Sequence, residues 1–190
     1  AILDDGLQQK NIEYNLKIAC FNSSEFIGNG FVLPAGPLRE SIKEIKNYDI
    51  IFINGSNKST KKIKQKIKSL NKKIEILEAE YVAQNINTFN KSKNYLMFCG
   101  IGNPKEFENT LLKHKFKLHK KFIFADHHNF TNEEVASLKK IALENKLKII
   151  TTEKDYLRLN LKQRKKIKFL KVSLKINKIN KFKKKLFNIK

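Results

Sequence analysis

Residues 122–152 decide the fold class of this chain, and they read FIFADHHNFTNEEVASLKKIALENKLKIITT. An apolar run at 122–125 predicts a strand, and a second apolar run at 147–152 predicts another. Between them, Thr131 and Glu134 have the spacing of a capping box, and the apolar residues that follow recur at helical spacing. A strand, a helix and a strand in this order are typical of a parallel sheet covered by helices.

The same alternation extends through the chain and predicts an α/β fold with a mostly parallel sheet. The polar stretch 85–94 has no periodicity and predicts a linker, so we expect two lobes, 1–88 and 89–190. The predicted strands are 1–3, 16–21, 49–54, 95–99, 122–125, 147–152 and 169–174. Further helices are predicted after Asn103-Pro104, on the apolar stripe Ile63, Ile67 and Leu70, and on the stripe Ile179, Phe182, Leu186 and Ile189.

Charge is the most unusual feature of the composition, because 40 Lys and Arg against 18 Asp and Glu give a formal net charge of +22. This excess favours phosphate-rich partners such as nucleic acid, anionic lipid surfaces or phosphorylated substrates. A general bias of composition toward lysine explains the excess equally well. Cys20 and Cys99 are too few and too far apart for a disulfide framework or a zinc site. No run reaches the roughly 20 apolar residues that a membrane-spanning helix needs.

Two adjacent carboxylates, Asp4 and Asp5, follow the first predicted strand and precede Gly6. Open α/β sheets bind ligands at the carboxyl ends of their strands, where phosphoryl transfer uses carboxylates to hold Mg²⁺. Asp-Asp-Gly is also good turn chemistry, so a metal site and a plain turn both remain open.

The segment 28–40 reads GNGFVLPAGPLRE and holds three of the seven glycines and two of the three prolines. It predicts a rigid path with close backbone approaches, in which Pro37 is suited to open a helix. Arg39 could then clamp a phosphate with two hydrogen bonds, with Glu40 beside it. The alternative is a stiff crossover in which Arg39 and Glu40 only pair with each other.

The strand at 122–125 is followed by Asp126, His127 and His128. Adjacent histidines beside a carboxylate at a strand end suit a general acid or base, or a metal site. His114 and His119 fall among lysines, and we interpret both as surface residues.

The predicted strand at 147–152 is also followed by polar residues. Thr152 can cap the next helix, and Asp155, three residues later, can complete the cap with a reciprocal contact. Capping explains most of this pattern, although Lys154 could also reach an anionic ligand.

Taken in order, five motifs resemble the tetraacyldisaccharide 4'-kinase family, the lipid A 4'-kinases of Gram-negative bacteria. The segment from Pro34 to Glu40 is the most specific of them, and the resemblance covers essentially the whole chain. The matching motifs are Ile2-Leu3-Asp4-Asp5-Gly6-Leu7-Gln8, Gly28-Asn29-Gly30 with Leu33-Pro34-Ala35-Gly36-Pro37-Leu38-Arg39-Glu40, Gly100-Ile101-Gly102-Asn103-Pro104, Asp126-His127-His128, and Thr151-Thr152-Glu153-Lys154-Asp155.

The resemblance implies a P-loop kinase with two α/β/α lobes, the first incomplete at its N-terminus and the second smaller. It also implies ATP and Mg²⁺ as cofactors, with transfer of the γ-phosphate to the 4'-hydroxyl of a tetraacyldisaccharide 1-phosphate in lipid A biosynthesis. The implied partners are this glycolipid and an anionic membrane surface, without nucleic acid. The implied location is the cytoplasmic face of the bacterial inner membrane, where excess lysine suits both anions.

The same resemblance implies roles for individual residues. Asp4 and Asp5 stand at the Walker B position, as catalytic and metal-binding residues. Gln8, Arg39 and Glu40 fall where the family lines its active site and binds substrate. One histidine of the pair His127 and His128 would support the catalytic base.

The family's Walker A loop, its catalytic aspartate and its hydrophobic anchor would all lie upstream of Ala1. We therefore expect this chain to be N-terminally truncated, without a nucleotide-binding loop of its own, and inactive alone. The DNA immediately upstream is expected to encode a Gly-rich loop ending in Gly-Lys-Thr or Gly-Lys-Ser.

Two other functions remain as alternatives. A metal-dependent phosphoesterase could use Asp126, His127 and His128 as ligands, but it needs further Asp and His ligands, and no Asp-x-Asp pair or later histidine follows. A nucleic-acid-binding module is supported by charge alone, because basic residues interleaved with aromatic residues on a sheet face are lacking.

Overall fold

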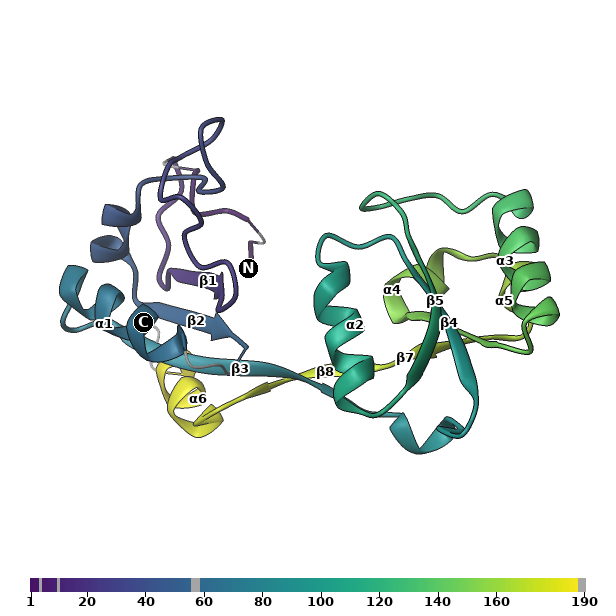
Figure 1. The fold of residues 1–190 in the computed structure, drawn as a ribbon. Helices are drawn as coiled ribbons and strands as arrows, with labels where there is room; N and C mark the ends of the chain where they lie inside the picture. Colours follow the sequence, from purple (N-terminus) through teal and green to yellow (C-terminus); the bar gives the residue numbers. More distant parts are fainter. Residues whose placement is uncertain (4, 10, 56–58, 188–190) are drawn as a thin grey trace. The chain divides into compact units, whose positions relative to one another are not determined.

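The structure is a computed structural model, which describes residues 1–3, 5–9, 11–55 and 59–187. The chain forms two compact units (Figure 1). Residues 1–81 and 174–190 make up the first unit, and residues 82–173 make up the second. The expected single boundary at residue 88 thus differs from this division, because the chain returns to the first unit after residue 173.

The sheet of the first unit has the strand order β1-β2-β3-β8. β1, β2 and β3 run parallel, with Ile18 beside Ile50 and Ile50 beside Glu75. β2 is buried on both faces along its apolar residues, as is typical of a central parallel strand. The strands are β1 (Ile18–Asn22), β2 (Ile50–Asn54), β3 (Glu75–Ala83) and β8 (Val172–Ile176).

Helices cover both faces of this sheet, because successive strand residues point to opposite sides. Ile51 and Ile53 pack in one cluster with Ile63 and Ile67 of α1 (Ser59–Leu70). On the other face, Phe52 packs against Phe182 of α6 (Ile179–Phe187), with their rings 5.1 Å apart. A short 3₁₀ helix, η1 (Ile42–Asn47), precedes β2. The helices predicted from the two apolar stripes are therefore confirmed among the described residues, and Ile189 of the second stripe lies outside them.

The second unit has an entirely parallel sheet with the order β5-β4-β6-β7. Met97 and Cys99 pack against α2 (Pro104–Lys113), whereas Leu96 and Phe98 pack against α3 (Asn132–Glu144) on the opposite face. This is the predicted α/β arrangement. Its other elements are η2 (Ile86–Thr88), β4 (Asn94–Cys99), β5 (Lys117–Ile123), β6 (Lys148–Thr152), α4 (Glu153–Arg158), α5 (Leu161–Arg164) and β7 (Ile167–Leu170).

Two strand predictions need correction. Residues 1–3 were expected to end a strand, but they form none, and Ile2 is fully exposed. A strand needs a hydrogen-bonded neighbour, and no strand in the described part of the chain pairs with these residues. The single strand expected at 169–174 is two strands, β7 and β8, which belong to different sheets and are separated by Lys171.

Other boundaries differ because charged residues interrupt the apolar pattern. β3 was not predicted, since Glu75, Glu78 and Glu80 break up its apolar run. β5 begins at Lys117, ahead of the predicted 122–125. The linker expected at 85–94 contains the turn η2 and the buried Phe89, so it packs on the second unit as part of its core.

Candidate functional site

Polar residues gather at the carboxyl ends of three parallel strands in the second unit. Gly100 follows β4, and Asp126 and His127 come shortly after β5. Helix α4 starts directly after β6 and carries Lys154, Asp155 and Arg158. Because the carboxyl ends of parallel strands meet at one edge, these residues lie together there. We call these six residues the edge cluster.

Asp155 anchors the edge cluster and is fully buried. Its Oδ2 accepts hydrogen bonds from the Gly100 amide at 3.0 Å and from the Thr152 hydroxyl at 2.7 Å. Thr152 also caps α4, as predicted, by accepting from the Asp155 amide. Arg158, three residues on, pairs with Asp155 Oδ1 at 3.3 Å and donates to the Gly100 carbonyl at 3.2 Å. A buried charge needs such partners, so Asp155 and Arg158 hold each other in place.

The His127 ring is exposed and faces two cationic side chains. Its Nδ1 lies 3.0 Å from Arg158 Nη2, and its Nε2 lies 3.3 Å from Lys154 Nζ. Guanidinium and ammonium groups both only donate, and a neutral imidazole has one acceptor nitrogen, so the ring can accept from one of the two cations. The contact with Arg158 is the shorter of the two, and a ring that accepts there through Nδ1 carries its hydrogen on Nε2. Nε2 cannot accept from Lys154 in that tautomer. In that tautomer the Nε2–H group faces the Asp126 carboxylate, whose Oδ2 lies 3.9 Å away, and the Lys154 ammonium lies beside it as a second donor.

His128 has different surroundings. Its ring stacks on Phe124 with centroids 4.8 Å apart, and its Nε2 lies 2.9 and 3.0 Å from the two carboxylate oxygens of Glu134. Glu134 also completes the predicted capping box with Thr131. The hydrogen bond from His128, and then that from the Thr131 amide, lower the pKa of Glu134. His128 is thus tied to the start of α3.

Sequence reasoning missed two contributors to the edge cluster. A Cβ at Gly100 would lie 3.0 Å from the Ala125 carbonyl oxygen and 3.1 Å from His128 Cβ, so a side chain there would force β4 or the loop after β5 to shift by a few tenths of an ångström. Arg158 was also missed, although its spacing of three from Asp155 on a helix is a usable signal. Cys99 is no candidate nucleophile, since burial first and then the Asp155 charge raise its pKa to about 12.

The first unit brings together only some of its predicted site residues. Asp5 Oδ2 and Arg39 Nη2 form an ion pair at 3.1 Å, with both side chains more than half exposed. Glu40 accepts a hydrogen bond from the Tyr48 hydroxyl, so Arg39 pairs with Asp5 and not with Glu40. Gln8 is exposed and forms no hydrogen bond or ion pair with the residues that the structure describes. Asp4 lies outside the described residues.

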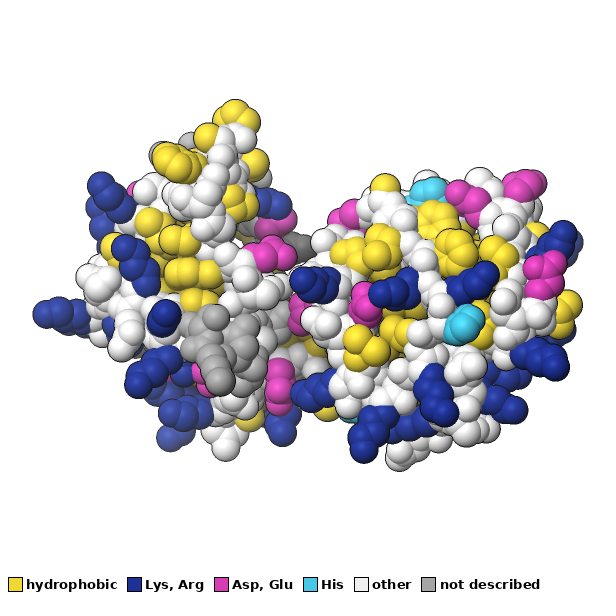
Figure 2. Space-filling view, viewed as in Figure 1, with side chains coloured by type: hydrophobic (Ala, Val, Ile, Leu, Met, Phe, Trp, Pro, Cys, Tyr) yellow, Lys and Arg dark blue, Asp and Glu magenta, His cyan; other side chains and the backbone are white. Residues whose placement is uncertain are grey.

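The segment 28–40 follows a folded path without a helix. The Asn29 side chain donates to the Ala35 carbonyl at 2.8 Å, and a Cβ at Gly36 would collide with the Phe31 backbone. Pro37 does not open a helix as expected, because a bridge between Val32 and Leu38 keeps this part extended and η1 starts only at Ile42. Apolar side chains are exposed at the tip of the segment (Figure 2), including Phe31 at 63% and Leu33 at 62%.

The described residues offer one carboxylate suited to Mg²⁺ near Arg39. Mg²⁺ is usually held by one or two carboxylates together with water and substrate phosphates. Asp5 is 69% exposed and binds Arg39 through one oxygen, so its chemistry fits such a role. No group of three or more His, Cys, Asp or Glu among the described residues could hold a metal ion.

No helix in the described part of the chain combines the length and apolar content needed to cross a membrane.

Comparisons with known proteins identify relatives along nearly all of the chain. The family model described as Tetraacyldisaccharide-1-P 4'-kinase matches residues 1–189. A tetraacyldisaccharide 4'-kinase from Pelagibacter ubique is 43% identical over 177 residues, which cover 93% of this chain and 56% of the relative. One from Rickettsia akari is 34% identical over 167 residues, covering 84% of this chain and 47% of the relative. The chain thus spans about half the length of the curated relatives it matches.

A solved structure has the same fold. It is LpxK from Aquifex aeolicus in complex with ATP, which matches with a TM-score of 0.63 at 21% identity over 97% of this chain and 56% of that one. From the extent of the family match and the identity to its members, the chain belongs to the tetraacyldisaccharide-1-P 4'-kinase family.

Proposed function

We propose that this chain is part of an ATP-dependent kinase that phosphorylates the 4'-hydroxyl of a tetraacyldisaccharide 1-phosphate in lipid A biosynthesis. The observation that carries the proposal is the family match over residues 1–189. In the reaction, the 4'-hydroxyl oxygen bonds to the γ-phosphorus while the bond from phosphorus to the bridging oxygen of ADP breaks. The hydroxyl proton must pass to a base.

In the first unit, Asp5 and Arg39 are the proposed phosphate-handling residues. Asp5, with Asp4 beside it in the sequence, would hold Mg²⁺, which supplies charge neutralisation for the ATP phosphates. Arg39 can exchange its exposed ion pair with Asp5 for a phosphate oxygen, since guanidinium groups bind phosphate well. Gln8 and Glu40 are proposed to contact substrate.

In the second unit, His127 is the proposed functional histidine. Arg158 fixes the tautomer that carries hydrogen on Nε2, and this N–H can donate to and orient a carboxylate that acts as the base. Lys154 lies beside it as a cation available to an anionic group. His128 is proposed to act as a structural residue through its contact with Glu134.

The substrate is expected to be an anionic lipid at the cytoplasmic face of the inner membrane. The exposed apolar residues Phe31 and Leu33 lie on the same segment as Arg39, so this segment offers both apolar and cationic contacts to an amphipathic anion. The net charge of +22 further favours an anionic surface.

The proposal is tested with the full-length protein, ATP, Mg²⁺ and tetraacyldisaccharide 1-phosphate, by measuring labelled phosphate transfer at the 4' position. His127→Gln is expected to lower kcat on the order of 10²-fold or more, because the orienting N–H is lost. His119→Gln is the matched control, since His119 is exposed on β5 outside the edge cluster, and it should leave the rate unchanged. A full-length protein that transfers no phosphate overturns the activity, whereas equal rates for the two variants overturn only the role of His127.

A further inference from the structure

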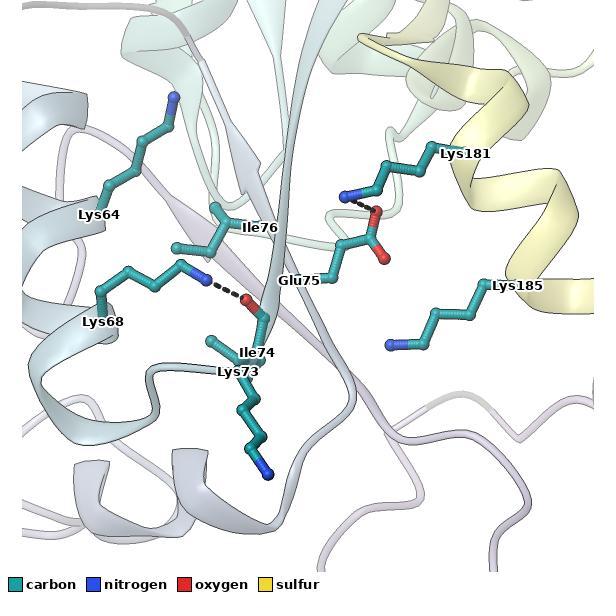
Figure 3. Close-up of a pocket in the computed structure, with 8 residues that line it drawn as sticks. All are labelled: Lys64, Lys68, Lys73, Ile74, Glu75, Ile76, Lys181 and Lys185. Carbon is teal, nitrogen blue, oxygen red and sulfur yellow. Dashed lines mark hydrogen bonds and ion pairs between the residues drawn. The ribbon is translucent and has the colours of Figure 1, made fainter.

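A hollow of about 460 Å³ lies in the first unit, and lysines supply most of its lining. Lys64 and Lys68 are one turn apart on α1, and Lys181 and Lys185 are one turn apart on α6. Figure 3 shows the two pairs on opposite sides of β3, whereas the Lys73 ammonium points away from the others. We call the four lysines of α1 and α6 the lysine pocket.

The strand at the centre explains how two helices line one hollow. Ile74 and Ile76 point toward α1, and Glu75 between them points toward α6 (Figure 3). β8 ends at Ile176, and the next amide, that of Asn177, donates to the Glu78 carbonyl. The first residues of β3 therefore lie beyond the end of β8, where the hollow forms along the strand edge.

The contacts within the protein leave part of the positive charge of the lysine pocket uncompensated. Lys64 pairs with Glu78 at 2.5 Å, and Lys181 pairs with Glu75 at 3.2 Å. Among the residues that the structure describes, the other two ammonium groups bind backbone carbonyls alone, Lys68 that of Ile74 at 2.6 Å and Lys185 that of Asp49 at 3.0 Å. Within this described part of the chain, four ammonium groups thus face two carboxylates.

Unused hydrogen-bond donors in the lysine pocket also favour an anionic ligand. Each ammonium group has three N–H donors, and these contacts occupy only one or two of them. An oxyanion with several acceptor oxygens can use the remaining donors and the excess charge together. A hollow of this size is within the range of small-molecule sites and has room for more than an isolated phosphate.

The position of the lysine pocket separates it from the proposed phosphoryl-transfer residues. The hollow includes Glu75, the first residue of β3, and Lys185 binds the carbonyl of Asp49, which directly precedes β2. These are the amino ends of parallel strands, whereas α/β sheets place their reactive ligands at the carboxyl ends.

We propose that the lysine pocket binds a phosphate group, carried by an anionic lipid headgroup or free in solution, as a second anion site of this protein. Its ligand exchanges with Glu75 for the Lys181 ammonium and completes the coordination of Lys185. The site does not depend on the proposed kinase activity.

Binding is tested on the whole chain by following the backbone amide signals of Ile74, Glu75 and Ile76 by NMR during titration with inorganic phosphate. Lys181→Gln with Lys185→Gln is expected to weaken binding on the order of tenfold through loss of two charged donors. Lys183→Gln with Lys184→Gln removes the same charge from the same helix outside the lysine pocket, and it should change the affinity by less than about twofold. Equal weakening by both pairs overturns the site, because general charge then explains the binding.

A variant that is expected to tighten binding distinguishes loss of the site from loss of folding. Glu75→Gln keeps the shape of the side chain but releases Lys181, so it should tighten phosphate binding, which an unfolded variant cannot do. An unchanged or weakened affinity for this variant contradicts the proposal.

A second arm identifies the source of the phosphate. Cosedimentation with vesicles of phosphatidylglycerol in phosphatidylcholine is compared for the two lysine pairs. A larger loss for Lys181→Gln with Lys185→Gln supports the site with a headgroup as its ligand. If the pairs differ with inorganic phosphate but not with vesicles, the ligand is a soluble phosphate.

Discussion

At the scale of residues, His127 shows how the backbone prepares a side chain for chemistry. Its φ of 61° lies in the left-handed region, which is uncommon outside glycine. In this conformation its amide donates to the Gly100 carbonyl at 3.2 Å and to Asp126 Oδ1 at 2.9 Å. The backbone is thereby held at the strand edge while the ring reaches Arg158. Such strained residues cluster at functional sites.

If Arg158 acts through His127, their substitutions will not be additive. Arg158→Gln should lower kcat of the full-length kinase, because the ring loses the donor that fixes its tautomer. Adding Arg158→Gln to His127→Gln should lower kcat no further, as expected for residues that act as a unit. Steady-state kinetics of the two single variants and the double variant measure this coupling. Independent, multiplying losses would instead assign Arg158 a separate role, for example in supporting Asp155.

The contact between His128 and Glu134 predicts a pH dependence of stability. The pKa of Glu134 is lowered in the folded protein from its ordinary value of 4.5, so the folded state favours the charged carboxylate. This contribution is fully present above pH 4.5 and is lost as the pH falls through the lower pKa of the folded state.

Glu134→Gln should therefore reduce the loss of stability on acidification, measured as the urea midpoint at neutral pH and at a series of acidic pH values. Glu133→Gln, at the exposed neighbouring position, is the control and should leave the acid dependence unchanged. The same acid dependence in the Glu134→Gln variant as in the unmodified protein would show that the contact contributes nothing.

At the scale of elements, each helix of the second unit presents one side to the sheet. On α2, Phe107 and Leu111 are buried four residues apart and pack with Met97 of β4, whereas Leu112 is half exposed. The period of the helix, not the identity of the residue, decides which leucine contributes to stability.

Leu111→Ala should lower the free energy of unfolding by about 2–5 kcal/mol, the usual cost of removing a fully buried leucine side chain. Leu112→Ala changes the same residue type at the next position of the same helix and should lower the free energy of unfolding by less than about 1 kcal/mol. Equilibrium unfolding in urea measures both values. Comparable losses for the two variants would mean that α2 is rotated from its described orientation.

At the scale of the whole molecule, the chain leaves the first unit through β3 and returns to it through β8 (Figure 1). The C-terminal helix α6 therefore completes the core of a unit that consists mainly of residues 1–81, far away in the sequence. Phe182 packs there with Ile50, Phe52 and Leu77, and the clusters of the second unit contain no residue of α6.

Phe182→Ala should consequently speed hydrogen exchange at the amides of β2 and leave those of β4 unchanged, because only the first unit loses packing. Phe187→Ala alters the same residue type on the same helix at a position that is 84% exposed, and it should affect neither strand. Faster exchange at β4 in the Phe182→Ala variant would contradict the assignment of α6 to the first unit.

The sequence by itself determined what local chemistry encodes. The capping residues Asn103, Thr131 and Thr152 mark the starts of three helices, and the structure confirms each cap. Apolar runs located β2, β4 and β6, since strands buried on both faces need no polar alternation. Order and spacing of motifs also predicted the family that the comparisons identify.

Only the tertiary structure decided what depends on distant partners. The glutamates of β3 interrupt the apolar pattern by which a strand is predicted from sequence. In the fold, Glu75 pairs with Lys181 and Glu78 pairs with Lys64, and only folding brings these lysines near. Arg158 meets His127 across 31 positions of sequence through the shared edge of a parallel sheet. The placement of α6 and the division of 167–176 between two sheets have the same cause, because strand pairing is non-local and leaves no periodic signal in the segment itself.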